Sequence, residues 1–395
     1  MAVCDSTESP TYATKLDRIQ PFHVMRLLAE ARALEAAGRD IVHMEVGEPD
    51  FPCPQPILDA GIRALQAGLT HYTPALGLPA LREAIAAYYQ ERYGLTISPR
   101  RILVTPGASG ALQLLSALLT DPGDEWLLAD PGYPCNRNLI ALQNGRPTGL
   151  AVGPESGFQL SAAQVDANWK SGQTRAVLVT TPANPTGGVL TRSDLTALHA
   201  VVRSRGGHLV VDEIYQGLTY QAVDHTALAL GEDVFVVNSF SKYFGMTGWR
   251  LGWLVAPEAA IPDLDKLAQN LFLAASTPAQ HAALAAFAPG TRAILEQRRA
   301  LFEARRDFLG AALRELGFGL PYWPEGAFYL YADVSSTGLD SDTLGARLLH
   351  EVGVASTPGR DFGTHESERY LRLAYTTDFD RLEQGVSRIR RWLET

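Results

Sequence analysis

Residues 234–256 read VFVVNSFSKYFGMTGWRLGWLVA, in which two short apolar runs enclose a polar loop that contains glycine. The runs at 234–238 and 250–256 have the length and composition of strands buried on both faces. Each ends in a polar or glycine-bearing segment, which is typical of a strand in a largely parallel sheet. Similar runs precede this stretch at 101–105, 125–129, 176–181 and 208–211.

Segments with helical periodicity alternate with these runs. Residues 79–93 have proline in the first turn and Gly94 as a stop signal, and 108–119 forms a second predicted helix. The alternation predicts an α/β fold with crossover helices. Ligands of such sheets bind beyond the carboxyl ends of the strands, so we expect the chemistry in those loops.

A different pattern follows residue 291. The run 291–317 has helical spacing over about seven turns, a length that often bridges two domains. Beyond it, a strand at 328–332 and helices at 341–351 and 380–394 predict a smaller α+β unit. We expect the N-terminal segment to pack on that unit.

The net charge, the cysteines and the apolar runs limit the classes of protein to which this chain can belong. The 395 residues carry a net charge of -9, which disfavours nucleic acid and anionic membrane surfaces as partners. The cysteines, Cys4, Cys53 and Cys135, form no CxxC pair, so neither a disulfide framework nor a metal site is expected. No apolar run has the length of a membrane span and no signal peptide is evident. These features predict a soluble, cytoplasmic protein.

Lys242 follows the apolar run at 234–238 and has Ser239, Ser241 and Arg250 nearby. Burial of a lysine lowers its pKa, which makes the amine able to form an imine with an aldehyde. The two hydroxyls and the guanidinium could bind a phosphate. Alone, Lys242 could equally be an ordinary loop lysine.

Asp212 ends another strand and Tyr215 follows three residues later. A carboxylate at this place can keep a pyridine nitrogen protonated, and the phenol can bind a ring oxygen. Without other signals, a helix-capping aspartate and a half-buried tyrosine would be the simpler interpretation.

Three more strand-end loops and the segment YLRLAY of the smaller unit carry candidate groups. Asn184 offers an amide, Tyr133 can stack on a flat ring, and the TPGAS loop at 105–109 opens a helix that can bind an anion. Arg372 has the planar fork that grips a carboxylate. Each feature alone could be a turn, a packed tyrosine or a surface ion pair.

Seven motifs in order give a resemblance over nearly the whole chain: VGEPDF, YTPALGLPALREAI, DPGYP, NPTG, VVDEIY, SFSKYFGMTGWRLGW and YLRLAY. The chain resembles the aspartate aminotransferase superfamily, the fold type I enzymes that use pyridoxal 5'-phosphate (PLP), in its class I and II branch. That fold implies a mostly parallel seven-stranded sheet flanked by helices. It divides the chain into an N-terminal arm at 1–45, a large PLP domain at 46–290 and a small domain at 291–395.

The resemblance implies that Lys242 holds PLP as a Schiff base and that Asp212 partners the pyridine nitrogen. Asn184 and Tyr215 would contact the phenolic oxygen, and Tyr133 would stack on the ring. The resemblance assigns the phosphate to backbone amides and side chains at two loops: Ala108, Ser109, Ser239, Ser241 and Arg250.

For the substrate and the assembly, the resemblance implies three further roles. Arg372 would bind the α-carboxylate, assisted by Gly47 and Asn184, and Tyr72 would reach the PLP phosphate of a second subunit in a homodimer. In one aspartate-specific branch, the position of Ser109 is similar to a lysine that reaches the distal carboxylate. Ser109 lacks that charge, so we expect a poor aspartate aminotransferase.

The implied reaction moves an amino group from an L-amino acid to a 2-oxo acid by a ping-pong mechanism. The same fold and cofactor also support C–S β-elimination and decarboxylation, which stay open as alternatives. A PLP sensor fused to a DNA-binding module is disfavoured, since no helix-turn-helix motif precedes the family-like segments and the charge is acidic.

Overall fold

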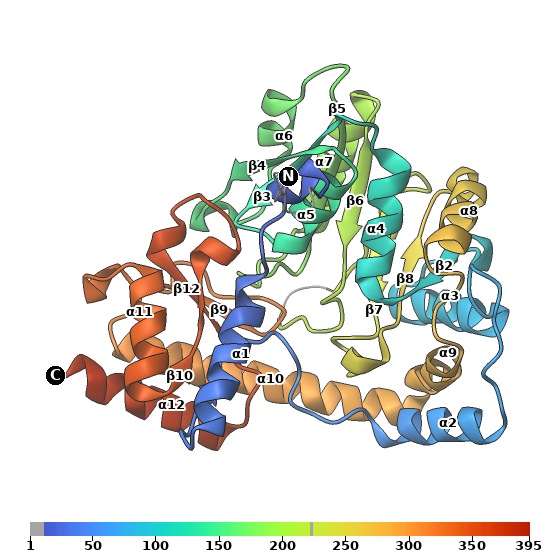
Figure 1. Ribbon diagram of the computed structural model, residues 1–395. Helices are drawn as coiled ribbons and strands as arrows, with labels where there is room; N and C mark the ends of the chain where they lie inside the picture. The colour runs from blue at the N-terminus through green and yellow to red at the C-terminus, as the bar shows by residue number, and fades with distance from the viewer. Residues whose placement is uncertain (1–11, 222–223) are drawn as a thin grey trace, which may run out of the picture.

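The computed structural model describes residues 12–221 and 224–395 (Figure 1). Its largest sheet has seven strands in the order β2-β8-β7-β6-β5-β3-β4. Only β8 runs antiparallel to its neighbours, so the sheet is mostly parallel, and the predicted α/β class is confirmed. The strands, in chain order, are β2 (Ile102–Thr105), β3 (Glu125–Asp130), β4 (Arg146–Ala151), β5 (Thr174–Thr180), β6 (His208–Asp212), β7 (Phe235–Ser239) and β8 (Gly252–Val255).

Helices bury both faces of this sheet. In β5, Val177 and Val179 belong to one apolar cluster, and Ala176 and Leu178 belong to another, because successive side chains point to opposite faces. This explains the continuous apolar runs in the sequence. The first cluster includes residues of α3 (Pro79–Tyr93), α6 (Ala162–Asn168) and α7 (Arg192–Ser204), and the second includes residues of α4 (Gly107–Leu119), α5 (Pro134–Leu142) and α8 (Ile261–Leu271).

One strand of the sheet was not predicted. β4 pairs only with β3, at the edge, and most of its residues are partly or fully exposed. Its sequence RPTGLA contains Pro147 and Gly149, residues that are tolerated at an edge and weaken any pattern of alternation. Elsewhere the predicted strands differ from the observed ones by one or two residues at their ends. The predicted helix at 341–351 is α11 (Ser341–Arg347) followed by a π-helical turn (Leu348–Val352).

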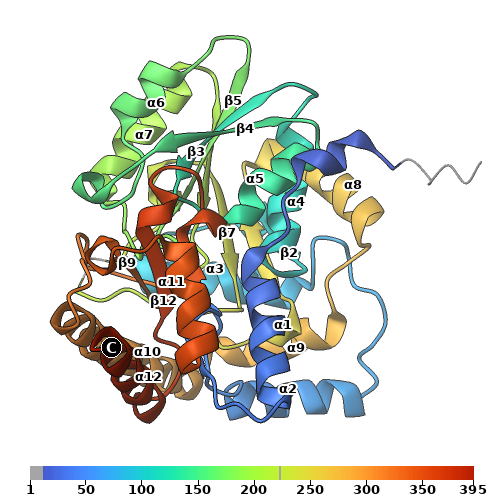
Figure 2. The same ribbon diagram turned by 60° about the vertical axis from the view of Figure 1, so that its left-hand side comes forward.

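The C-terminal part of the chain builds a second layer, joined to the first by α10 (Pro289–Glu315). A three-stranded antiparallel sheet has the order β11-β12-β9, and α12 (Phe379–Leu393) packs on α10. Figures 1 and 2 both place α1 (His23–Ala36) beside these elements. The remaining strands are β1 (Val42–His43), β9 (Tyr329–Asp333), β10 (Val354–Ala355), β11 (Thr357–Pro358) and β12 (Tyr370–Ala374).

The N-terminal segment is joined to this layer by a parallel pairing of β1 with β10. The exact domain boundaries at 45/46 and 290/291 stay a prediction. Within residues 12–221 and 224–395, no helix is long and apolar enough to cross a membrane. Cys53 and Cys135 are free thiols, and Cys4 lies outside the described residues.

Candidate active site

A cavity lies at the carboxyl edge of the large sheet, between that sheet and β9 and β12. It brings together most of the residues that the sequence motifs indicated, from seven separate segments of the chain. These are Gly47, Ala108, Ser109, Tyr133, Asn184, Asp212, Tyr215, Lys242 and Arg372.

Lys242 lies just beyond the end of β7 and is mostly shielded from solvent. Its Nζ donates to the carbonyl oxygen of Gly47 at 2.6 Å and lies 5.8 Å from the ring centroid of Phe328. Burial lowers the pKa of the ammonium from 10.5 to about 8, because a charged amine is poorly solvated there. The amine is therefore far easier to deprotonate than an exposed lysine, as imine formation requires.

Asp212 is the last residue of β6 and is almost completely buried. Its Oδ1 accepts the backbone N–H of Ile214 at 3.0 Å, the one hydrogen bond found for this carboxyl among the described residues. Burial raises its pKa from 3.8 to about 7. A buried carboxylate without a cationic partner is costly, so this position suits a ligand that brings positive charge.

The start of α4 forms an anion cradle. Its N-cap residue is Pro106, which has no side-chain cap to offer, so the first backbone amides stay available. Gly107 has φ +71°, and a Cβ there would lie 2.6 Å from a guanidinium nitrogen of Arg250. Arg250 also approaches the Ser241 hydroxyl at 3.5 Å. The helix start, the guanidinium and the hydroxyl thus converge where the sequence predicted a phosphate.

Ser239 is buried beside this cradle and does not line the cavity. Its hydroxyl contacts Ser241 Oγ at 3.0 Å and the carbonyl oxygen of Leu251 at 3.1 Å. It also accepts the backbone N–H of Ser241 at 3.0 Å, so it shapes the turn that presents Ser241. A direct phosphate contact by Ser239 stays a prediction.

Arg372 lies on the opposite side of the cavity, in β12, and is almost completely buried. It donates to Asn184 Oδ1 at 2.9 Å and to the carbonyl oxygen of Glu45. Its Nε is buried and has no partner among the described residues. A carboxylate would satisfy this donor and the charge together, which fits the predicted role in binding the substrate α-carboxylate.

Tyr329 is a site residue that the motifs did not reveal. It projects from β9, and its hydroxyl lies 2.8 Å from the hydroxyl of Tyr215. Arg372 stacks over its ring, 4.4 Å from the centroid. A Cβ on Gly47 would lie 1.9 Å from the Tyr329 hydroxyl, so only glycine fits at position 47. The sequence marks Tyr329 only as one residue of an apolar strand, which hides its polar contact.

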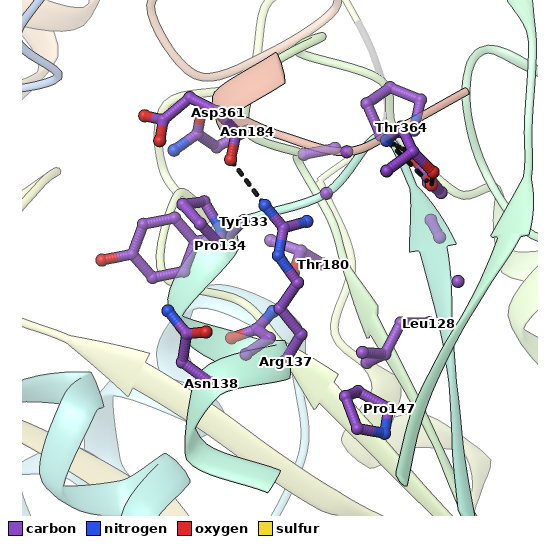
Figure 3. A pocket seen from close by; sticks show the side chains of 18 of the residues that line it. Leu128, Tyr133, Pro134, Arg137, Asn138, Pro147, Thr180, Asn184, Asp361 and Thr364 are labelled. Atoms are coloured by element: carbon purple, nitrogen blue, oxygen red, sulfur yellow. Dashed lines mark hydrogen bonds between the residues drawn. The ribbon is translucent and has the colours of Figure 1, made fainter. Parts of the chain in front are cut away.

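Apolar side chains complete the wall of the cavity. Phe22, Val24 and Met25 come from the start of α1, and Leu112 comes from α4. The ring of Phe22 meets the ring of Tyr133 edge to face, with centroids 5.9 Å apart. A neighbouring pocket shares Tyr133 and Asn184 with this cavity (Figure 3). No sequence motif marked the N-terminal wall.

Tyr72 is the one predicted site residue that is remote from the cavity of its own chain. It is 85% exposed and lies in the segment between α2 (Gln55–Gln66) and α3. Thr277 holds the neighbouring His71 through a 2.7 Å hydrogen bond to its carbonyl oxygen. Contact with a partner's phosphate stays a prediction.

The residues present fit PLP. The α4 cradle with Arg250 suits a phosphate, and Lys242 suits an aldehyde. The buried carboxylate of Asp212 has no cationic partner among the described residues, so it suits a protonated ring nitrogen. Tyr133 offers a flat ring in the same cavity. The match rests on four kinds of chemistry at one place.

Comparisons with known proteins agree with this geometry. The model of the family "Aminotransferase class I and II" matches residues 39–389. The valine–pyruvate aminotransferase of Mycobacterium tuberculosis is 36% identical over 380 residues, which cover 95% of this chain and 97% of that protein. The aspartate aminotransferase of Bacillus subtilis is 35% identical over 393 residues, covering 97% of this chain and 98% of that protein.

Solved structures lead to the same family. A crystal structure of an aminotransferase from Mycobacterium tuberculosis has a TM-score of 0.94 and 35% identity, and covers 98% of this chain and 100% of that one. Aspartate aminotransferase from Thermus thermophilus with maleate has a TM-score of 0.92 and 32% identity, and covers 97% and 99% of the two chains. The chain therefore belongs to the class I and II aminotransferase family and is a PLP-dependent transaminase.

Proposed function

We propose that this transaminase takes its amino group from neutral L-amino acids with apolar side chains. One observation carries the proposal: of the described residues that line the cavity, only Asp212, Lys242 and Arg372 are charged. Each already has a role with the cofactor or the α-carboxylate. No lining cation of this chain is left for a distal carboxylate, and Ser109 offers only a hydroxyl where a lysine would serve aspartate.

The relatives support two different donors. The name of the Mycobacterium tuberculosis relative includes valine and pyruvate, a donor and an acceptor without a charged side chain. Several other relatives are called aspartate aminotransferases, so aspartate is the second candidate. The apolar wall of Phe22, Val24 and Leu112 favours the first, because burying a carboxylate against it without a partner would be costly.

The roles of the residues follow from their places in the cavity. When bound, PLP withdraws electrons from the substrate α-carbon and so weakens its bond to hydrogen. Arg372 holds the α-carboxylate, and Asn184 orients Arg372. Lys242 would hold PLP, and its Nζ would carry the α-proton of the substrate. A 2-oxo acid then accepts the amino group in a second half-reaction, which gives ping-pong kinetics.

A panel of amino donors with pyruvate and 2-oxoglutarate tests this proposal. We expect kcat/KM for valine, leucine or alanine to exceed that for aspartate. Ser109→Lys should raise kcat/KM for aspartate, by about tenfold, and Ser109→Thr is the matched neutral control. A clear preference of the wild type for aspartate contradicts the proposal. Release of sulfide or carbon dioxide without amino transfer would favour the lyase or decarboxylase alternative.

We also propose a homodimer with shared active sites. Apolar side chains are exposed on α2 and on the segments after α2 and α8: Ile62, Leu65, Leu69, Leu271 and Leu273. Tyr72 is exposed in the same part of the chain, and a second copy related by a two-fold axis would cover both. A two-fold interface is reciprocal, so each subunit would complete the site of the other.

Subunit exchange tests the shared site. Lys242→Ala and Tyr72→Glu should each be inactive, whereas mixing them should regenerate one intact site in each heterodimer. Tyr72→Phe is the milder control for the charge. A fully active monomer in light scattering would exclude this assembly. The cytoplasm is the compartment that we propose, supported by the free thiols Cys53 and Cys135, and cell fractionation tests it.

A further inference from the structure

The first turn of α1 lacks a local cap. Its N-cap residue is Phe22, which has no side-chain oxygen, although the first amides of a helix need acceptors. A residue far along the chain supplies them: Asp361 Oδ1 accepts the backbone N–H of His23 at 3.0 Å, and Oδ2 accepts that of Val24 at 3.4 Å. The carboxylate also faces the positive end of the helix dipole.

Asp361 is itself held rigidly. It is 2% exposed, and Arg137 of α5 donates to its carbonyl oxygen at 2.7 Å and to that of Phe362 at 2.9 Å. Figure 3 shows Arg137 extending from α5 toward Asp361, with Tyr133 and Asn184 close by. The loop that carries Asp361 therefore connects α1 to the helix that follows Tyr133.

The turn that Asp361 caps is also the apolar wall of the active-site cavity. Phe22, Val24 and Met25 line the cavity, and Phe22 packs edge to face on Tyr133. None of these three side chains is part of the groups that bind the cofactor or the α-carboxylate. A bound amino donor would therefore meet this wall with its side chain, and only if that side chain is long enough.

We propose that Asp361 is a positioning residue for substrate selectivity: by capping α1, it holds Phe22 and Val24 against the side chain of a long apolar amino donor. This inference rests on the proposed preference for neutral donors. Asp361 does not line the cavity that holds Lys242 and Arg372. Loss of the cap should let the side chains of Phe22 and Val24 move away from the cavity. It should leave the chemistry at Lys242 unchanged.

Selectivity between a long and a short donor is the measurement that a purely structural role would not change. For Asp361→Ala, we expect kcat/KM to fall about tenfold for leucine and less than about twofold for alanine, whose methyl group does not reach the wall. Asp361→Asn keeps one acceptor oxygen, so its kcat/KM for leucine should lie between those of the wild type and Asp361→Ala. Asp340→Ala is the matched control, because Asp340 caps α11 through the Thr343 amide.

A double-mutant cycle tests the route of the effect. Phe22→Ala should lower the leucine-to-alanine ratio by itself, and adding Asp361→Ala should lower it little further, because both changes remove one wall. Fully multiplicative effects of the two substitutions would overturn the proposal. So would an equal loss for leucine and alanine in Asp361→Ala.

Hydrogen exchange separates this inference from the proposed function. Asp361→Ala should speed exchange of the first amides of α1 and leave α11 unchanged, and Asp340→Ala should do the reverse. If the wild type transfers no amino group from neutral donors, the proposed function is wrong. The exchange experiment still decides whether Asp361 caps the first turn of α1. Unchanged exchange in α1 would overturn the inference even in an active enzyme.

Discussion

The two sides of the cavity are built in different ways. On the cofactor side, Asn184, Asp212 and Lys242 each lie at or just beyond the end of a strand in the large sheet and carry a polar or ionisable group. On the substrate side, Phe22 and Tyr329 come from opposite ends of the chain and contribute packing or a single hydroxyl. The cofactor side depends on buried ionisable groups, whereas the substrate side, apart from the buried Arg372, depends on the position of its side chains.

This difference has an energetic consequence. Burial raises the pKa of Asp212 and lowers that of Lys242, so both groups are destabilised in their charged forms. Such groups are retained because chemistry requires them. The substrate wall carries no such cost, and its loss should alter selectivity more than turnover. Substitutions on each side of the cavity test this difference.

The largest effect is expected at Lys242. Lys242→Ala removes the amine, so amino transfer should fall to background, while PLP still binds through the α4 cradle without a covalent bond. Lys266→Ala, at an exposed lysine paired with Asp263, is the control and should stay active. Borohydride reduction of the wild-type holoenzyme should label Lys242, and a label on another lysine would contradict the assignment.

The next effect concerns the stability of the cofactor-free protein. The pKa of Asp212 is raised from 3.8 to about 7, so the folded state holds this proton more tightly than the unfolded state does. The free energy of unfolding therefore decreases as pH rises from about 4 to about 7. Asp212→Asn removes this cost and should stabilise the cofactor-free protein at pH 8 by as much as about 4 kcal/mol.

Denaturant unfolding at pH 5 and pH 8 measures this gain, which should be larger at pH 8. Asp340→Asn is the control of opposite sign, because hydrogen bonds at Thr343 lower the pKa of Asp340. If Asp212→Asn raises the free energy of unfolding by the same amount at both pH values, the ionised carboxylate of Asp212 does not destabilise the folded protein.

Turnover tests the same residue in the holoenzyme. We propose that Asp212 is the counter-charge of the ring nitrogen. Asp212→Ala would remove that charge, so kcat should fall about a hundredfold or more, with a smaller effect on PLP affinity. Stopped-flow measurement of the first half-reaction and PLP titration separate the two quantities. Near-normal turnover would remove Asp212 from the chemistry.

The smallest effect is expected on the substrate side, at Tyr329. Tyr329→Phe leaves the buried hydroxyl of Tyr215 without its 2.8 Å partner. We expect kcat to fall a few fold, which corresponds to a rise of about 1 kcal/mol in the activation free energy. It should also shift the pH titration of the visible absorbance of the holoenzyme. Tyr331→Phe is the control on the same strand, because the Tyr331 hydroxyl is buried without a partner among the described residues. Equal effects of the two substitutions would contradict a specific role.

The sequence predicted the cofactor side far better than the substrate side. Asp212 and Lys242 lie next to apolar runs whose strand character is visible locally, and parallel strands bring their carboxyl ends to one edge. β4 escaped prediction because Pro147 and Gly149 interrupt its pattern at an exposed edge. Tyr329 was not identified as a site residue because its segment has the apolar sequence of a buried strand. A single hydroxyl group within such a strand gives no local signal of a polar contact.

The sequence by itself determined the α/β class, the order of the strand-end motifs and the kind of chemistry, since apolar periodicity and strand-end side chains are local properties. Only the tertiary structure placed Phe22 against Tyr133, gave α1 a cap from Asp361, and left Arg372 Nε without a partner among the described residues. The first two features join positions that lie more than a hundred residues apart in the sequence. They depend on how whole elements pack, and packing geometry leaves no periodic trace in the chain.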